Sequence, residues 1–164
     1  MFRVGISGDL LNSRDEPCFG MGPLNLLKDR EDIEISWMDK SITELDTEMT
    51  SKFDAILLNL PKANANCVSN SNRKLKIISR FGVGFDSVDI EAMKKKNIIV
   101  TNTPNAVRRP VAVAALTMIF AVAGKLLQKD HLVRSGKWND RTNYMGAGLT
   151  RKTLGVIGAG NIGT

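Results

Sequence analysis

The sequence predicts an α/β protein in which a parallel sheet is covered by helices. From the second residue onward, short apolar segments typical of buried strands alternate with segments of helical character. The last apolar segment runs into a glycine-rich turn at 158–163. Because parallel strands need long crossover connections, which are usually helices, this alternation favours a parallel sheet. The composition, with 43% hydrophobic and 24% charged residues, is typical of a globular chain.

Five strand candidates and two helix candidates precede residue 104. The strands are expected at 2–7, 33–38, 53–60, 75–81 and 98–102. One helix is expected at 23–30, and another at 89–96, where Asp89 can cap the first turn and Asn97 can end the helix. We expect the polar, asparagine-rich segment 61–74 to be a surface loop with one poor helical turn.

A long helix is expected to begin between Asn105 and Pro110 and to bridge into a second unit, with a boundary near residue 104. Its apolar residues lie on more than one face, so nearly all of its surface should be covered. The uncharged run 111–124 has 14 residues, which is too short to span a bilayer. A loop-rich segment, 137–152, then leads to a strand at 154–157.

Gly158, Gly160 and Gly163 follow that strand in G-x-G-x-x-G spacing. The first glycine makes a tight turn, the second lets the backbone approach a pyrophosphate, and the third allows a helix to pack closely on the strand. This spacing after a strand predicts the start of a dinucleotide-binding site. The acidic residue that would contact the ribose is expected about 20 residues later, beyond Thr164.

Charge and cysteine content argue against several other classes of protein. The net charge is +6, but the basic clusters at 94–96, 108–109 and 151–152 are short and scattered, which favours solvated faces over attraction of anionic substrates or nucleic acid. Cys18 and Cys67 fit neither a metal spacing nor a disulfide-rich scaffold. No metal site and no signal peptide are expected, and reduced thiols suggest the cytoplasm.

Segment 75–107 carries a combination of motifs that is found in one known family. A strand is followed by Arg80, Gly82, Gly84, Asp86, Val88 and Asp89, then by a helix and by Asn102-Thr103-Pro104. Segments 132–141 and 153–163 continue the pattern in the same order. Over about residues 50–164 the chain therefore resembles the D-isomer-specific 2-hydroxyacid dehydrogenases, in particular the members similar to phosphoglycerate dehydrogenase.

The resemblance implies a flavodoxin-like substrate domain at 1–104, followed at 105–164 by the start of a Rossmann domain. It implies NAD as cofactor, with NADP left open, a small 2-hydroxy or 2-oxo acid as substrate, and a homodimeric parent protein. Neither nucleic acid nor a membrane is an expected partner.

The resemblance also assigns roles to individual residues. It places the substrate carboxylate on Val83 and Gly84, whose backbone N–H groups can form an anion-binding nest. Arg80 would add positive charge beside them. The cofactor would contact Thr103, Gly158, Gly160, Asn161, Ile162 and Gly163.

Plainer interpretations of these residues stay open. Arg80 could pair with a surface acid, and Thr103 could simply form a turn. Asp86 and Asp89 are more typical of turn and cap residues than of an acid/base pair. The chain also departs from the family at Val113, where a glutamate is usual, and at Val107-Arg108, which leaves the identity of the substrate open.

The resemblance implies that the catalytic residues of the family, an arginine, an acid and a histidine, all follow the glycine turn. The single histidine, His131, precedes the turn and is expected on the surface, so no catalytic residue is assigned. We therefore expect an inactive N-terminal fragment of a dehydrogenase. The alternative is a non-catalytic module, either a dehydrogenase-like corepressor or a free-standing flavodoxin-like domain.

Overall fold

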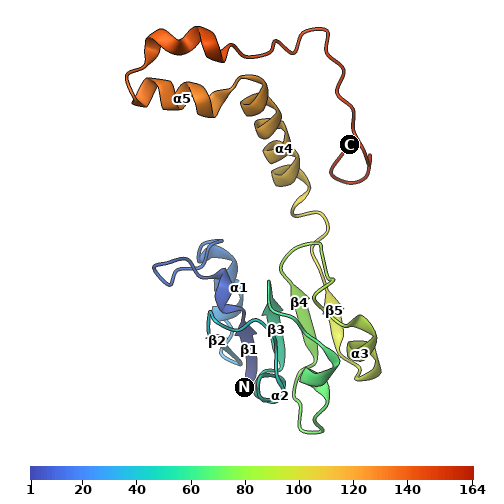
Figure 1. Cartoon of the computed structure of the whole chain (residues 1–164). Helices are drawn as coiled ribbons and strands as arrows, with labels where there is room; N and C mark the ends of the chain where they lie inside the picture. Colours follow the sequence, from blue (N-terminus) through green and yellow to red (C-terminus); the bar gives the residue numbers. More distant parts are fainter. The chain divides into compact units, whose positions relative to one another are not determined.

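The computed structural model describes every residue, 1–164, and the chain divides into two compact units (Figure 1). The first unit comprises Met1–Pro104 and the second comprises Asn105–Thr164.

The first unit is built on a five-stranded sheet in the order β2-β1-β3-β4-β5, and every strand pair is parallel (Figure 1). The predicted parallel α/β fold is confirmed, and each strand lies inside its expected segment. The strands are β1 (Phe2–Ile6), β2 (Ile33–Trp37), β3 (Ala55–Leu58), β4 (Ile77–Arg80) and β5 (Ile99–Thr101).

Alternate residues of the central strands pack on opposite faces of the sheet. Val4 and Ile6 of β1 lie in register with Ala55 and Leu57 of β3, and they share one apolar cluster. Ile56, Leu58 and Ile78 belong to a larger cluster. Because both faces of these strands are covered, the strands appear in the sequence as continuous apolar runs, and burial of each large side chain stabilises the fold by about 1.5–3 kcal/mol.

Helices α1 (Gly22–Lys28), α2 (Thr47–Lys52) and α3 (Ile90–Lys95) accompany the sheet, with a 3₁₀ turn at Gly8–Leu10. The expected cap of α3 is confirmed, because the Asp89 carboxylate accepts the Ala92 N–H at 2.9 Å. Helix α2 has no counterpart among the expected elements. It is capped in the same way by Asp46, which accepts the Met49 N–H at 2.9 Å.

Segment 61–74 was only partly predicted as a surface loop. It contains the expected short helical turn, a 3₁₀ turn at Ala65–Val68. However, Ala63, Cys67 and Val68 are almost fully buried in the larger cluster. Burial of these three apolar residues holds the segment against the larger cluster despite its polar composition.

The second unit contains α4 (Arg108–Ala123), α5 (Leu126–Arg134) and a 3₁₀ segment at Trp138–Tyr144. The expectation of one continuous helix is wrong, because the chain turns at Gly124 and Lys125. Lys125 has a left-handed conformation with φ of 50°, which ends α4. The Ala147 N–H then donates to the Ala123 carbonyl at 2.8 Å, which satisfies one of the helix's terminal acceptors.

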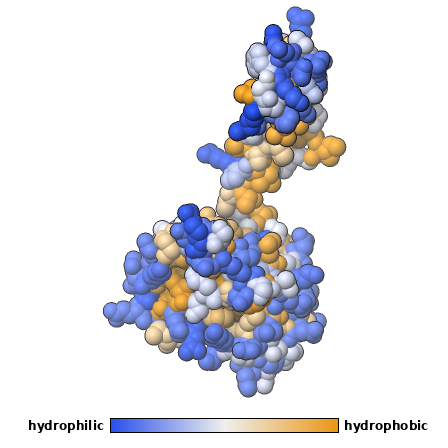
Figure 2. Space-filling model, turned by 60° about the vertical axis from the view of Figure 1, so that its left-hand side comes forward, coloured by the Kyte–Doolittle hydropathy of each residue, from blue (hydrophilic) through white to orange (hydrophobic).

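Within residues 1–164, no side chain of α4 is buried. Apolar atoms accordingly lie on the surface of the second unit (Figure 2). Neither helix alone has the length and apolar character needed to cross a membrane. Taken together, α4 and α5 meet those criteria, but they are bent by 62° relative to each other.

The expected strand at 154–157 is also wrong, since this segment forms no strand and is exposed. A strand requires a neighbouring strand to accept and donate its backbone hydrogen bonds, and the second unit offers none.

Candidate functional site

The carboxyl ends of β1, β3, β4 and β5 meet at one edge of the sheet, as they must in a parallel arrangement. Polar side chains follow each of these strands: Asp9 after β1, Asn59 after β3, Arg80 at the end of β4 and Asn102 after β5. In open α/β sheets, ligands bind outside this edge. This edge of the sheet is therefore the expected location of a ligand-binding site.

Arg80 is the last residue of β4 and is paired in register with Leu58 of β3. Its Nη1 donates to the Asn59 side-chain oxygen at 3.3 Å and to the Phe81 carbonyl. Its Nε is buried and has no hydrogen-bond acceptor. Arg80 forms no ion pair with an acid, so the plainer interpretation of a surface salt bridge does not apply.

The loop that follows β4 is tied to the end of β5 by three hydrogen bonds. Gly82 N–H donates to the Thr103 hydroxyl at 3.1 Å, and Thr103 N–H donates to the Gly82 carbonyl at 2.9 Å. The Asn102 amide donates to the Val83 carbonyl at 2.8 Å. Thr103 thus holds the loop, and Asn102 is a functional candidate to which sequence reasoning assigned no role, although its motif was noticed.

Those bonds leave the N–H groups of Val83 and Gly84 without an acceptor in the protein. Gly84 is exposed and Val83 is half-buried, so a ligand can reach this backbone. Successive unpaired N–H groups form a concavity of positive potential that binds anions. The structure therefore brings Arg80, Val83, Gly84 and Thr103 together, with a cation beside two free donors.

The glycine turn belongs to the second unit and is exposed throughout. A side chain at Gly163 would place its Cβ 2.4 Å from the Gly158 carbonyl oxygen, so the turn closes on itself only because Gly163 has none. Gly160 is surrounded by open space, which permits close approach of a ligand to its backbone. Residues 161–163 form a turn, not a helix. The backbone of the turn is therefore accessible at Gly160.

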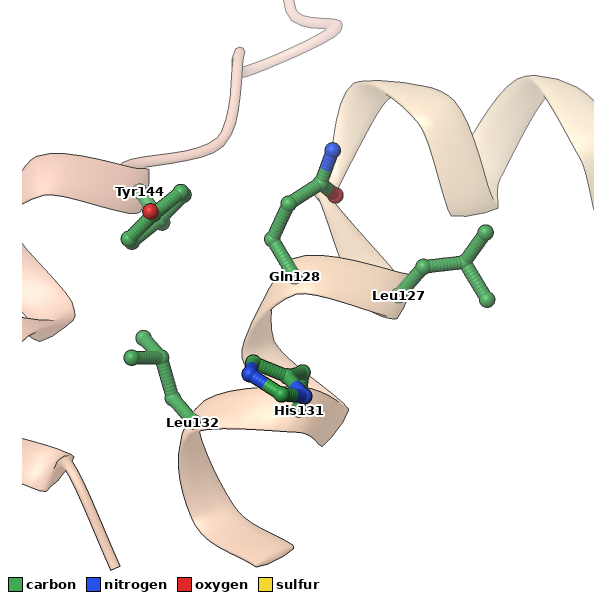
Figure 3. A pocket seen from close by; sticks show the side chains of 5 residues that line it. All are labelled: Leu127, Gln128, His131, Leu132 and Tyr144. Atoms are coloured by element: carbon green, nitrogen blue, oxygen red, sulfur yellow. The ribbon is translucent and has the colours of Figure 1, made fainter. Parts of the chain in front are cut away.

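His131 lies on α5 and is exposed, in agreement with its expected surface position. It lines an open pocket of about 270 Å³ together with Leu127, Gln128, Leu132 and Tyr144 (Figure 3). The pocket contains no carboxylate that could orient the imidazole, so it lacks the pairing that a catalytic histidine requires.

The clearest pKa shifts in the first unit are found away from the candidate site. The Arg3 N–H, which donates to the Asp54 carboxylate at 3.0 Å, holds the pKa of that carboxyl below its usual value. Asp54 precedes β3, at the opposite edge of the sheet. Burial raises the pKa of the Cys67 thiol to about 11, so the thiol stays protonated and unreactive at neutral pH.

The model of the D-isomer specific 2-hydroxyacid dehydrogenase catalytic domain matches residues 22–159, which is most of the chain. The chain belongs to the D-isomer specific 2-hydroxyacid dehydrogenase family. This match includes the loop at 82–84 and Gly158, the first glycine of the turn, and it ends before Gly160.

Two relatives illustrate how similar the chain is to individual dehydrogenases and reductases. It is 37% identical over 131 residues to a glyoxylate reductase of Thermococcus litoralis, which covers 76% of this chain and 36% of the relative. It is 34% identical over 164 residues to D-3-phosphoglycerate dehydrogenase of Bacillus subtilis, covering all of this chain and 29% of the relative. The chain therefore spans about a third of the length of these relatives.

Solved structures of dehydrogenases have the same fold. D-lactate dehydrogenase of Aquifex aeolicus, solved as a complex with NAD and lactic acid, matches with a TM-score of 0.72 and 26% identity over 98% of this chain and 45% of its own. The pyruvate reductase of Chlamydomonas reinhardtii matches with a TM-score of 0.73 at 24% identity, over 99% of this chain and 46% of its own. The second likeness shows the fold alone.

Proposed function

We propose that the chain forms part of an NAD-dependent dehydrogenase that transfers hydride between a small 2-hydroxy acid and the nicotinamide. The observation that carries this proposal is the pair of unpaired N–H groups on Val83 and Gly84 beside Arg80. A 2-hydroxy acid has a carboxylate next to its reacting carbon. Two N–H donors and a guanidinium are suited to bind and orient that carboxylate.

The two units divide the work. Arg80, Val83 and Gly84 hold the substrate carboxylate, and Thr103 keeps the loop in place through Gly82. In the second unit, Gly158, Gly160, Asn161, Ile162 and Gly163 hold the pyrophosphate of the cofactor. NAD supplies the hydride acceptor when it is bound, and NADP remains an alternative. A cytoplasmic location likewise stays a prediction.

The substrate loop is tested by titrating the 164-residue protein with glycolate, the simplest 2-hydroxy acid, and following its backbone amides by NMR. We expect the shifts to centre on residues 80–85 and the affinity to be weak. The matched variants are Arg80→Lys, which should weaken binding, and Arg73→Lys, which should not, because the Arg73 guanidinium donates to the Asn70 and Lys96 carbonyls and makes no bond to the loop. Shifts confined to Lys94, Lys95 and Lys96 would instead indicate nonspecific attraction, and would contradict the proposed loop.

Hydride transfer itself is not expected from these 164 residues alone. His131 is the single histidine, and it lacks an orienting acid. The measurement is NADH oxidation by the purified chain with a series of 2-oxo acids, and turnover above background would contradict this part of the proposal.

We also propose that the complete dehydrogenase is a homodimer in which α4 is covered. Six large apolar side chains of this helix are at least 43% exposed within the chain: Val111, Val113, Leu116, Met118, Phe120 and Val122. A helix with this many exposed apolar side chains is rarely left in water. A second copy of the same helix provides a partner of matching apolar character.

A further inference from the structure

A chain of polar side chains leads from β1 to the candidate substrate loop. The Asp9 carboxylate accepts three hydrogen bonds: one from the Ser7 hydroxyl, one from the Asn59 side-chain amide at 2.6 Å and one from the Leu60 N–H at 3.1 Å. Ser7 is fully buried and Asp9 and Asn59 are partly buried, so this group of residues is largely shielded from water. Asp9 has no cationic partner and acts only as an acceptor.

The orientation of the Asn59 amide is fixed from both ends. An ionised carboxylate only accepts hydrogen bonds, so Asp9 must face the NH₂ group of Asn59. A guanidinium only donates, so Arg80 must face the oxygen, and the Asn59 Oδ1 accordingly lies 3.3 Å from the Arg80 Nη1. Because Asp9 binds the NH₂ group of Asn59, the Asn59 oxygen points toward Arg80 and accepts its hydrogen bond.

That acceptor holds the guanidinium against the substrate loop. A Cβ built on Gly82 would lie 3.1 Å from Arg80 Nη1 and 3.7 Å from Nη2, so the guanidinium packs directly on the Gly82 backbone. Asn59 Oδ1 and the Phe81 carbonyl both bind Nη1, while Nη2 has no acceptor and Nε is buried without one. The Nη2 group is thus left to serve a ligand.

We propose that Asp9 is a positioning residue, which acts through Asn59 to orient Arg80 toward the carboxylate that binds at Val83 and Gly84. The inference rests on the proposed function for the ligand, but the orientation of Arg80 can be measured without one. Asp9 itself does not touch the substrate.

The test compares Asp9→Asn with the wild-type 164-residue chain. In the variant, the new side-chain amide can present either its oxygen or its NH₂ group to Asn59. The Asn59 amide can then rotate so that its NH₂ group faces Arg80, and Arg80 Nη1 loses the Asn59 oxygen as its acceptor. The readout is the Arg80 Nε–Hε cross-peak in a ¹H–¹⁵N spectrum, assigned by its loss in Arg80→Lys. We expect it to move and its exchange with water to accelerate about tenfold, with glycolate affinity falling by about the same factor.

Glu44→Gln is the matched control, because the Glu44 carboxylate accepts the Asn64 side-chain amide at 2.7 Å but has no connection to Arg80. It should leave the Arg80 cross-peak and glycolate binding unchanged. If Asp9→Asn does not fold, Asn59→Ser removes the same acceptor and is measured in the same way.

An unmoved cross-peak in the folded Asp9→Asn protein overturns the inference, as does an equal change in Glu44→Gln. If the wild-type chain binds no glycolate at the loop, the proposed function fails. The cross-peak comparison without ligand still decides whether Asp9 positions Arg80.

Discussion

At Gly82 the backbone adopts φ of +131°, and the Arg80 guanidinium packs against the space where a side chain would be. We expect Gly82→Ala to strain the loop and displace Arg80, with a loss of about 1–3 kcal/mol in the free energy of unfolding. Glycolate binding should weaken in parallel. Urea unfolding followed by circular dichroism, together with the NMR titration, measures both effects.

Gly84→Ala is the control for this prediction. A Cβ there meets only the Asp86 carboxylate at 3.8 Å, which is an ordinary contact, and the Gly84 N–H is retained. The change in the free energy of unfolding should stay within about 0.5 kcal/mol. Equal destabilisation by the two substitutions would contradict the geometry described for the loop.

The two cysteines should differ sharply in reactivity. Cys67 is 1% exposed and burial raises its pKa to about 11, whereas Cys18 is exposed. At pH 8, iodoacetamide should modify Cys18 in the native protein and leave Cys67 intact until denaturant is added. Mass spectrometry of the labelled chain checks this, with Cys18→Ser as the control in which native labelling disappears. Rapid native labelling of Cys67 would show that segment 61–74 opens readily.

At the scale of elements, Asp54 links β1 to β3. Its N–H donates to the Arg3 carbonyl at 2.8 Å, and its carboxylate accepts the Arg3 N–H at 3.0 Å. The second bond holds the pKa of Asp54 below its usual value, so the unfolded chain binds the proton more tightly than the folded one. This contribution to stability is therefore present above about pH 4 and is lost as the pH falls through the folded-state pKa.

Asp54→Asn should therefore lower the free energy of unfolding at pH 7 by about 1–2 kcal/mol and make stability less sensitive to acid below about pH 4. Urea unfolding between pH 3 and pH 7 measures the difference. Glu31→Gln, which removes an exposed carboxylate without a hydrogen bond, should leave the pH dependence as it is. If the free energy of unfolding of Asp54→Asn falls with acid as steeply as that of the wild type, the hydrogen bond between Arg3 and Asp54 does not contribute to the pH dependence of stability.

At the scale of the whole molecule, the exposed apolar surface of α4 should cause self-association. Phe120 is 62% exposed and Val122 is 78% exposed. We expect sedimentation of the 164-residue chain to depend on concentration, and the double variant Phe120→Glu, Val122→Glu to sediment as a monomer. Leu26→Glu, at an 80% exposed position of α1, is the control and should still associate. A wild-type chain that is monomeric at every concentration would contradict the proposal that a second copy of the chain covers α4.

Local signals account for the elements that could be predicted. The apolar runs of β3 and β4 and the Asp89 cap act within a few residues, so they are visible in the sequence. Helix α2 also has a local signal, because Asp46 caps its first turn, although no helix was expected there. The candidate site was partly predictable in the same way, because Arg80, Val83, Gly84 and Thr103 belong to one motif.

Other features depend on contacts that the sequence does not display. The break between α4 and α5 places Lys125 in a left-handed conformation that its residue type does not favour. Residues 154–157 have the residue types of a strand, but strand formation depends on a neighbour and not on residue type. Asp9 and Asn59 are 50 residues apart, and only the parallel pairing of β1 with β3 brings them together.

By itself the sequence determined the parallel α/β class, most strand positions, the family and the motif that forms the candidate substrate loop, because each depends on local patterns or on a contiguous motif. Only the tertiary structure decided which donors of that loop stay free. Hydrogen bonds from Asn102 and Thr103 occupy part of the loop, while Asp9 and Asn59 provide the acceptor for Arg80. The physical reason is that a free N–H group is defined by the absence of an acceptor nearby, and that depends on every strand that ends at the same edge of the sheet.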